Sequence, residues 1–138
     1  MYKELLLFID SCESESMFDS VTAPNILMMS TSRRDENAYS HSFSDELNNF
    51  LADKFTFHFH NLLKNEPQKL KTLTMKDFPI IFPYKTLESH LAFKNTFEDR
   101  QLQDFHLWHY FPVSKEEVVG NRDSVIYMNY ADMDENLL

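Results

Sequence analysis

Residues 5–17 read Leu-Leu-Leu-Phe-Ile-Asp-Ser-Cys-Glu-Ser-Glu-Ser-Met, and this stretch decides the fold. Five apolar residues stop abruptly at Asp10, and the only cysteine of the chain, Cys12, follows two positions later. A buried strand that ends at a nucleophile and turns into a helix is a common way to build a reactive site. The strand fixes the side chain, and the first amides of the helix face whatever approaches it. The pattern therefore predicts a site at the end of the first strand.

The composition indicates one packed domain and disfavours several classes of function. The chain has 138 residues, of which 43% are hydrophobic and 13 are phenylalanine, so it can bury one core. A net charge of -9 disfavours nucleic acid as a partner, because such a groove needs a positive field. One glycine, Gly120, cannot form a phosphate-cradling loop, and one cysteine excludes thiolate zinc clusters. We therefore expect no cofactor and no metal.

The first third of the sequence predicts a parallel α/β unit. Residues 4–10 are continuously apolar, as in a strand that is buried on both faces, and a short helix is expected over 11–19. Residues 26–29 predict a second buried strand, and the polar residues 33–41 predict a loop at the carboxyl edge of the sheet, where ligands bind. A first strand with two buried faces needs neighbours on both edges. This suggests that the chain is a fragment whose N-terminal strands are missing.

The rest of the chain is predicted with one local conflict. Residues 44–64 are long enough for a helix and carry a broad apolar stripe, although 55–60 alternate as a strand would. A short helical segment is expected over 75–82. Strands are expected over 89–94 and 104–110, followed by a linker, a last strand and an acidic tail at 114–121, 125–130 and 132–138. No segment has the length of a membrane span or the composition of a signal peptide.

Cys12 has two interpretations on chemistry alone. A free cysteine is more often a buried structural residue than a nucleophile. Its position before a helix favours the thiolate, whereas Glu13 and Glu15 oppose it through their negative charge. Asp10 lies two residues earlier, so in an extended chain its side chain shares a face with the thiol. It is either a carboxylate that caps a loop or an acid that lines a substrate pocket.

A thiol hydrolase also needs a general base, which is usually histidine. Of six histidines, His41 is the only local candidate, because it lies in the loop at the right edge of the sheet. His58 and His60 are expected on the long helix, where positions i and i+2 do not share a face, so they do not predict a metal site. His106 and His109 are expected to flank a strand and to be ordinary surface or core residues.

Five stretches, in order and with similar spacing, resemble one enzyme family. Ile9-Asp10-Ser11-Cys12 is similar to the Asp-Thr-Cys nucleophile motif of the catalytic subunit of GPI transamidase, a caspase-like cysteine peptidase related to legumain. The segment 12–17 is similar to legumain's Cys-Glu-Ser-Gly-Ser-Met. The other three are Pro24-Asn25-Ile26, Glu36-Asn37-Ala38-Tyr39-Ser40-His41 and Asp53-Lys54-Phe55-Thr56-Phe57. The resemblance covers residues 2–113.

The resemblance implies a caspase-like, mostly parallel sheet flanked by helices, with Cys12 as the nucleophile of a Cys–His dyad. In the family, the thiolate attacks the ω-site carbonyl near the C-terminus of a precursor protein, and the amine of a GPI lipid resolves the thioester. Asp10 matches an acidic pocket residue of legumain, and Asn37 and Ala38 stand where legumain has a serine pair that binds substrate. The resemblance also implies a membrane complex with other transamidase subunits on the luminal face of the endoplasmic reticulum.

The sequence departs from the family in ways that affect activity. The family's catalytic histidine lies on a preceding strand in a Gly-His-Gly context that is missing here, so we expect no turnover by this chain alone. A glycine usual in the long helix is Asn48. We therefore expect a partial catalytic domain over 1–113 and an extension over 114–138. Two alternatives are a non-catalytic α/β interaction module or degenerate paralogue with a structural Cys12, and a legumain-like endopeptidase whose arginine and histidine lie upstream.

Overall fold

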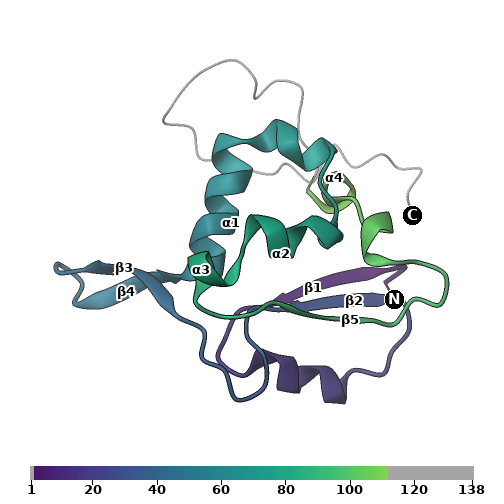
Figure 1. Cartoon of the computed structure of the whole chain (residues 1–138), viewed down its shortest axis with the longest axis horizontal. Coiled ribbons are helices and arrows are strands. Elements are labelled where there is room, and N and C mark those ends of the chain that lie inside the picture. Colours follow the sequence, from purple (N-terminus) through teal and green to yellow (C-terminus); the bar gives the residue numbers. More distant parts are fainter. Residues whose placement is uncertain (1, 112–138) are drawn as a thin grey trace.

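A three-stranded sheet lies at the centre of the computed structural model, which describes residues 2–111. The strand order is β1-β2-β5. The short helix η1 covers one face, and α1 and α2 cover the other (Figure 1). The bounds of these elements are β1 (Leu5–Ile9), η1 (Ser14–Ser20), β2 (Ile26–Ser30), α1 (Lys54–Asn65), α2 (Phe78–Ile81) and β5 (Ala92–Asn95). The predicted α/β class, with helices on both faces of a sheet, is confirmed and is consistent with a caspase-like fold.

The sheet is mixed rather than mostly parallel. β1 pairs with β2 in parallel, from Leu5 with Ile26 to Ile9 with Ser30. β5 pairs with the other edge of β2 in the antiparallel direction. Within residues 2–111 only one edge of β1 is paired, so β1 is half-buried although its sequence is continuously apolar. β2 is the central strand, and all five of its residues are buried.

Alternation along β2 divides the core between the two faces of the sheet. Ile26 and Met28 pack with Phe18 of η1 on one face. Leu27 and Met29 pack on the other face, where Phe8 of β1 also contacts the core. This larger cluster contains buried side chains from α1, α2 and the C-terminal segments, namely Phe55, Phe59, Leu62, Leu70, Met75, Phe78, Phe82, Leu87, Phe105 and Leu107. Phe8 of β1 contacts the rings of Phe55, Phe59 and Phe78, so aromatic packing fixes α1 and α2 on the sheet.

The predicted helix over 44–64 is wrong in its first half. Residues 40–53 form a β-hairpin, made of β3 (Ser40–Ser44) and β4 (Asn49–Asp53), and α1 begins only at Lys54. The hairpin projects from the body of the molecule (Figure 1). Its turn contains Asn48 at φ 48°, a left-handed conformation that asparagine tolerates and that ends any helix.

The predicted strand over 104–110 is also wrong. The chain forms two short helical turns there, η4 (Leu102–Asp104) and α4 (Leu107–Tyr110), with a single bridge between Thr74 and His106. Asp104 accepts a hydrogen bond of 2.7 Å from the backbone N–H of Gln101, which caps η4 and turns the chain. This local capping overrides the strand propensity of the aromatic residues that follow.

The remaining expectations hold where the structure describes them. The strand predicted over 89–94 is β5, shifted by up to three residues. The helical segment predicted over 75–82 consists of η3 (Met75–Asp77) and α2, with η2 (Pro67–Lys71) before it and α3 (Tyr84–Leu87) after it. The linker, strand and tail expected over 114–138 lie outside the described residues. In residues 2–111, no helix has both the length and the apolar character that crossing a bilayer requires.

Candidate active site

Cys12 lies at the carboxyl edge of the parallel strand pair, three residues after β1 ends. Its side chain is exposed. Its Sγ donates a hydrogen bond of 3.5 Å to the backbone carbonyl oxygen of Ala38, in the loop that follows β2. The thiol is therefore available to solvent at the sheet edge where the strand pattern placed it, and only one polar contact holds it.

The backbone amides after Cys12 are already used within the protein. The N–H groups of Glu13, Ser14 and Glu15 donate to acceptors in residues 32–36 over 2.9, 3.1 and 3.2 Å. The helix cap is Glu13, at φ 54°, and η1 is a 3-10 helix of 7 residues. The sequence predicted that these amides face whatever approaches the thiol. That prediction is wrong, because they donate to the loop after β2 instead.

A buried cluster of serines locks the loop of Cys12 against the end of β2. The hydroxyl of Ser32 donates to the carbonyl of Ser11 over 2.8 Å and lies 3.2 Å from the hydroxyl of Ser14. Both Ser14 and Ser32 are 0% exposed. Buried hydroxyls need such partners, so the pairing fixes the two loops relative to each other. Sequence reasoning missed this cluster, and its only signal was the run Ser30-Thr31-Ser32 after an apolar strand.

Asp10 joins three elements with its carboxylate. Oδ1 accepts from the hydroxyl of Thr31 over 2.7 Å, at the end of β2. Oδ2 accepts from both the hydroxyl and the backbone N–H of Thr56, over 2.6 and 3.2 Å. Thr56 is in the first turn of α1, whose own cap residue, Asp53, forms no side-chain cap bond. Asp10 therefore caps α1 from the end of β1, which favours its interpretation as a capping carboxylate.

Asp10 also lines a narrow depression beside the loop of residues 36–41. The depression is too narrow to admit a water molecule. Lys54 closes one side, held by Glu88 at 2.8 Å and by the ring of Tyr39 at 5.6 Å. The predicted substrate pocket thus corresponds to a filled space in this conformation.

Glu36 anchors the loop that carries Asn37 and Ala38. Its carboxylate accepts from the backbone N–H groups of Arg33 and His90, each over 2.9 Å, and lies 2.7 Å from Nδ1 of His90. Burial raises the pKa of Glu36, but the two backbone donors and the His90 ring outweigh it, so the pKa is lower than usual. Asn37 is exposed beside this anchor.

Comparison with known proteins identifies the family. The model of the Peptidase C13 family matches residues 1–113. The chain belongs to this peptidase family. It is 29% identical over 110 residues to the GPI-anchor transamidase of Saccharomyces cerevisiae. The aligned residues make up 80% of this chain and 26% of that protein. Over 89 residues it is 30% identical to the GPI-anchor transamidase of Schizosaccharomyces pombe, covering 64% of this chain and 23% of that protein.

A human relative extends the same similarity. The GPI-anchor transamidase of Homo sapiens is 33% identical over 63 residues, which are 46% of this chain and 16% of that protein. The chain thus spans about a quarter or less of the length of these curated relatives. The resemblance to the transamidase branch is confirmed.

Within residues 2–111, no histidine is a hydrogen-bond partner of the Cys12 thiol. His41 stacks on Phe57 with ring centroids 3.7 Å apart and lies 5.7 Å from the ring of His58. Burial lowers the pKa of His58, and the nearby charges of His41 and Lys54 lower it further. Within the same residues, no three His, Cys, Asp or Glu side chains gather as a metal site.

The pair of Glu36 and His90 is a second feature of the site that sequence reasoning missed. The two residues are 54 positions apart, and only the tertiary fold brings them together. His90 is further covered by the ring of Tyr84, at a centroid distance of 4.7 Å. A lone acid in a polar loop and a lone histidine before a strand carry no pattern that would have linked them.

Proposed function

We propose that Cys12 is the nucleophile of a cysteine transamidase and that this chain supplies the thiol half of its active site. The observation that carries the proposal is an exposed thiol at the carboxyl edge of the β1–β2 pair, in a chain of this peptidase family. The loop residues Asn37 and Ala38 lie next to it and are proposed to contact the substrate. Residues 1–113 are the proposed partial catalytic domain, and 114–138 the proposed extension.

The proposed reaction is acyl transfer in two steps. The Cys12 thiolate adds to the carbonyl carbon of the ω-site peptide bond, the C–N bond breaks, and the departing amine takes a proton. The thioester then reacts with the amine of an ethanolamine phosphate on a GPI lipid, which forms a new amide and releases the thiol. Transamidation and the GPI anchor follow from the names of the relatives. The ω site, the other subunits and the membrane of the endoplasmic reticulum are proposed from the family resemblance.

The chain is proposed to be inactive alone, because no histidine in residues 2–111 is bonded to the thiol and the family's Gly-His-Gly strand is not in the sequence. Within the described residues, the outer edge of β1 has no strand partner. A strand that pairs there would run beside the one that carries Cys12. We propose that the catalytic histidine enters the site on such a strand.

The test is complementation. The chain is mixed with a fragment of a relative that carries the Gly-His-Gly strand, and cleavage of an ω-site peptide is measured with a simple amine as acceptor. We expect turnover from the mixture, none from the chain alone, and none from the mixture with Cys12→Ala. Turnover by the chain alone that disappears in Cys12→Ala and in His41→Ala would show that the local histidine serves instead.

The second candidate is a non-catalytic α/β interaction module. Its support is the capping role of Asp10, which occupies the carboxylate that a substrate would need. The exposed Cys12 weighs against a buried structural thiol. The rate at which Cys12 is alkylated at neutral pH distinguishes the two candidates. An activated thiol reacts faster than free cysteine, whereas an ordinary thiol does not react faster. A legumain-like endopeptidase has less support, because Asp10 is already bonded to Thr31 and Thr56.

A further inference from the structure

Glu36 is the residue at which three segments around the thiol are joined. Its backbone carbonyl oxygen accepts from the N–H of Glu13, directly after the proposed nucleophile, over 2.9 Å. Its carboxylate accepts from the backbone N–H of Arg33, in its own loop, and from that of His90, shortly before β5. Glu36 therefore links the loop of the thiol, the loop after β2 and the segment that enters β5.

The ring of His90 adds a side-chain bond to this junction. Its Nδ1 lies 2.7 Å from Oε1 of Glu36. Burial raises the pKa of Glu36, but the backbone donors and the His90 ring outweigh it and lower the pKa, so the carboxylate is ionised at neutral pH and can only accept. Nδ1 therefore carries the proton and donates. A hydrogen bond to an ionised carboxylate is stronger than one between two neutral groups.

The rest of the fold holds His90 in place beside Glu36. Ser89 precedes it and is 2% exposed, and its hydroxyl donates to the carbonyl oxygen of Thr31 over 2.6 Å. The ring of Tyr84, in α3, covers the His90 ring at a centroid distance of 4.7 Å. β5 begins two residues later and is paired with β2. The donor that meets Glu36 is thus carried by rigid elements, as precise positioning requires.

The residues that follow Glu36 lie at the thiol. Ala38 accepts from Sγ of Cys12 over 3.5 Å, and Asn37, between Glu36 and Ala38, is exposed. On the other side, the carbonyl oxygen of Tyr39 accepts from the first N–H of α1 over 2.8 Å. The two residues proposed to contact the substrate are therefore a short span between two anchors, and one of these anchors is the bond between Glu36 and His90.

We propose that Glu36 and His90 form a positioning pair, which keeps residues 37–38 beside the thiol where the substrate binds. The inference rests on the proposed function of Cys12 and adds to it two residues that act through the loop. Without the ring bond, the loop occupies its binding position for only part of the time, and the apparent affinity for substrate falls by that fraction. The pair therefore acts on substrate binding and not on the chemical step.

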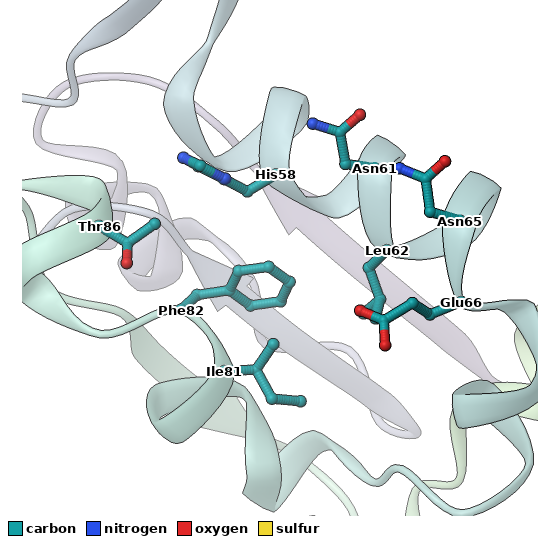
Figure 2. A pocket seen from close by; sticks show the side chains of 8 residues that line it. All are labelled: His58, Asn61, Leu62, Asn65, Glu66, Ile81, Phe82 and Thr86. Atoms are coloured by element: carbon teal, nitrogen blue, oxygen red, sulfur yellow. The ribbon is translucent and has the colours of Figure 1, made fainter.

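The pair acts at the edge of the sheet and not on the hollow beside α1. This hollow has a volume of about 240 Å³ and lies between α1 and the segment of α2 and α3. Figure 2 shows the side chains that line it, and they include neither His90 nor any residue of 36–38. Asn61→Ala, a change at the rim of this hollow, should therefore leave substrate binding unchanged and serves as one control.

The test compares three replacements of His90 in the full chain. Leucine keeps an apolar contact with Tyr84 but has no donor, whereas the amide of asparagine can donate from about the place of Nδ1. Glutamine also donates, but from the place of Nε2. In the complementation assay, His90→Leu and His90→Gln should raise KM for the ω-site peptide by about tenfold, while kcat stays within about twofold. His90→Asn should keep KM within about twofold of the wild type, which a role in packing alone would not explain.

Hydrogen exchange of the Glu13 amide tests the positioning in the chain alone, without turnover. Its acceptor is the carbonyl oxygen of Glu36, so His90→Leu should increase its exchange rate by about tenfold and His90→Asn should not. The matched control is His60→Leu, at an exposed position of α1, which should match the wild type in both measurements. The thermal midpoint of each variant checks that it is folded, and His90→Gln replaces His90→Leu if the latter does not fold.

The outcomes separate this inference from the proposed function. Turnover by the wild-type mixture together with a wild-type KM in His90→Leu and His90→Gln would overturn the positioning pair and leave Cys12 as the nucleophile. A raised KM in His90→Asn, or unchanged exchange of Glu13 in His90→Leu, would also overturn it. A wild-type mixture without turnover would overturn the proposed function, and with it the role of the pair in substrate binding.

Discussion

Asp10 shows how one side chain can be required for the fold at a position where a functional role was expected. Its carboxylate accepts from Thr31 and twice from Thr56, so it fixes the N-terminus of α1 to the ends of β1 and β2. An acid at this end of a helix also interacts favourably with the helix dipole. The same residue cannot be freely available as a ligand for substrate while it makes these bonds.

Asp10→Asn is expected to lower the free energy of unfolding by about 1–3 kcal/mol, because an amide cannot accept all three hydrogen bonds and carries no charge. Urea denaturation of the two proteins measures the difference. Asp99→Asn, at an exposed position outside the helices and strands, is the matched control and should have little effect. Equal stability of Asp10→Asn and the wild type would instead favour a pocket acid that acts only on substrate.

The hydrogen bonds of the Glu36 carboxylate should contribute to the free energy of unfolding in a pH-dependent way. Its pKa in the folded protein lies below the ordinary 4.5, since the donors from Arg33 and His90 outweigh its burial. A lowered pKa means that the stabilisation is present above about pH 4.5 and is lost as the pH falls through the folded value. Glu36→Gln should therefore be less stable than the wild type by about 1–2 kcal/mol at pH 7. Denaturation from pH 7 to 3 should show this difference shrinking, and a difference that stays constant would contradict the assignment.

At the scale of elements, the sequence predicted those segments whose local pattern and tertiary environment agree. Residues 5–9 and 26–29 are continuous apolar runs and became neighbouring parallel strands. The apolar stripe of Phe55, Phe59 and Leu62 also marked a real helix. The first half of that predicted helix failed, because the hairpin depends on left-handed residues at Ser42 and Asn48 that no apolar pattern reveals.

The difference between local pattern and tertiary contacts also explains which parts of the site the sequence could predict. The place of Cys12 follows from the end of an apolar run, which is local information. The bond between its Sγ and Ala38, the serine cluster and the Glu36–His90 pair all join residues that are 18 or more positions apart. These contacts exist only after β1, β2 and β5 have paired, so the sequence alone could place the thiol but not its surroundings.

Asn48 gives a test of the hairpin. Its φ of 48° is costly for residues with a Cβ, less so for asparagine and least for glycine. Asn48→Gly should preserve the β3–β4 pairing, whereas Asn48→Val should weaken it by about 1–2 kcal/mol. Hydrogen exchange of the backbone amides of β3 and β4 reports on this pairing. Equal protection in the glycine and valine variants would show that the turn does not determine the hairpin.

At the scale of the whole molecule, one polar cluster connects the start of the described chain to its end. Glu4 accepts from Arg100 and, over 3.0 Å, from the hydroxyl of Tyr110, across 96 and 106 positions of sequence. The guanidinium also lies 4.0 Å from the ring centroid of Phe105. The cluster therefore ties the segment before β1 to the turns that cover the edge of the larger core.

Tyr110 makes this connection measurable at alkaline pH. Burial, and then its hydrogen bond to Glu4, raises the pKa of Tyr110 to about 12. Because the folded value is above the ordinary 10, the stabilisation is complete below about pH 10 and is lost as the pH rises through 12. Tyr110→Phe should lose about 1 kcal/mol at pH 7 and should lack the phase near pH 12 in an absorbance titration of the phenolates. Tyr84→Phe, at an exposed position, should keep that phase. If the late phase persists in Tyr110→Phe, another tyrosine is the buried one, and the two ends of the described chain are not joined through this hydroxyl.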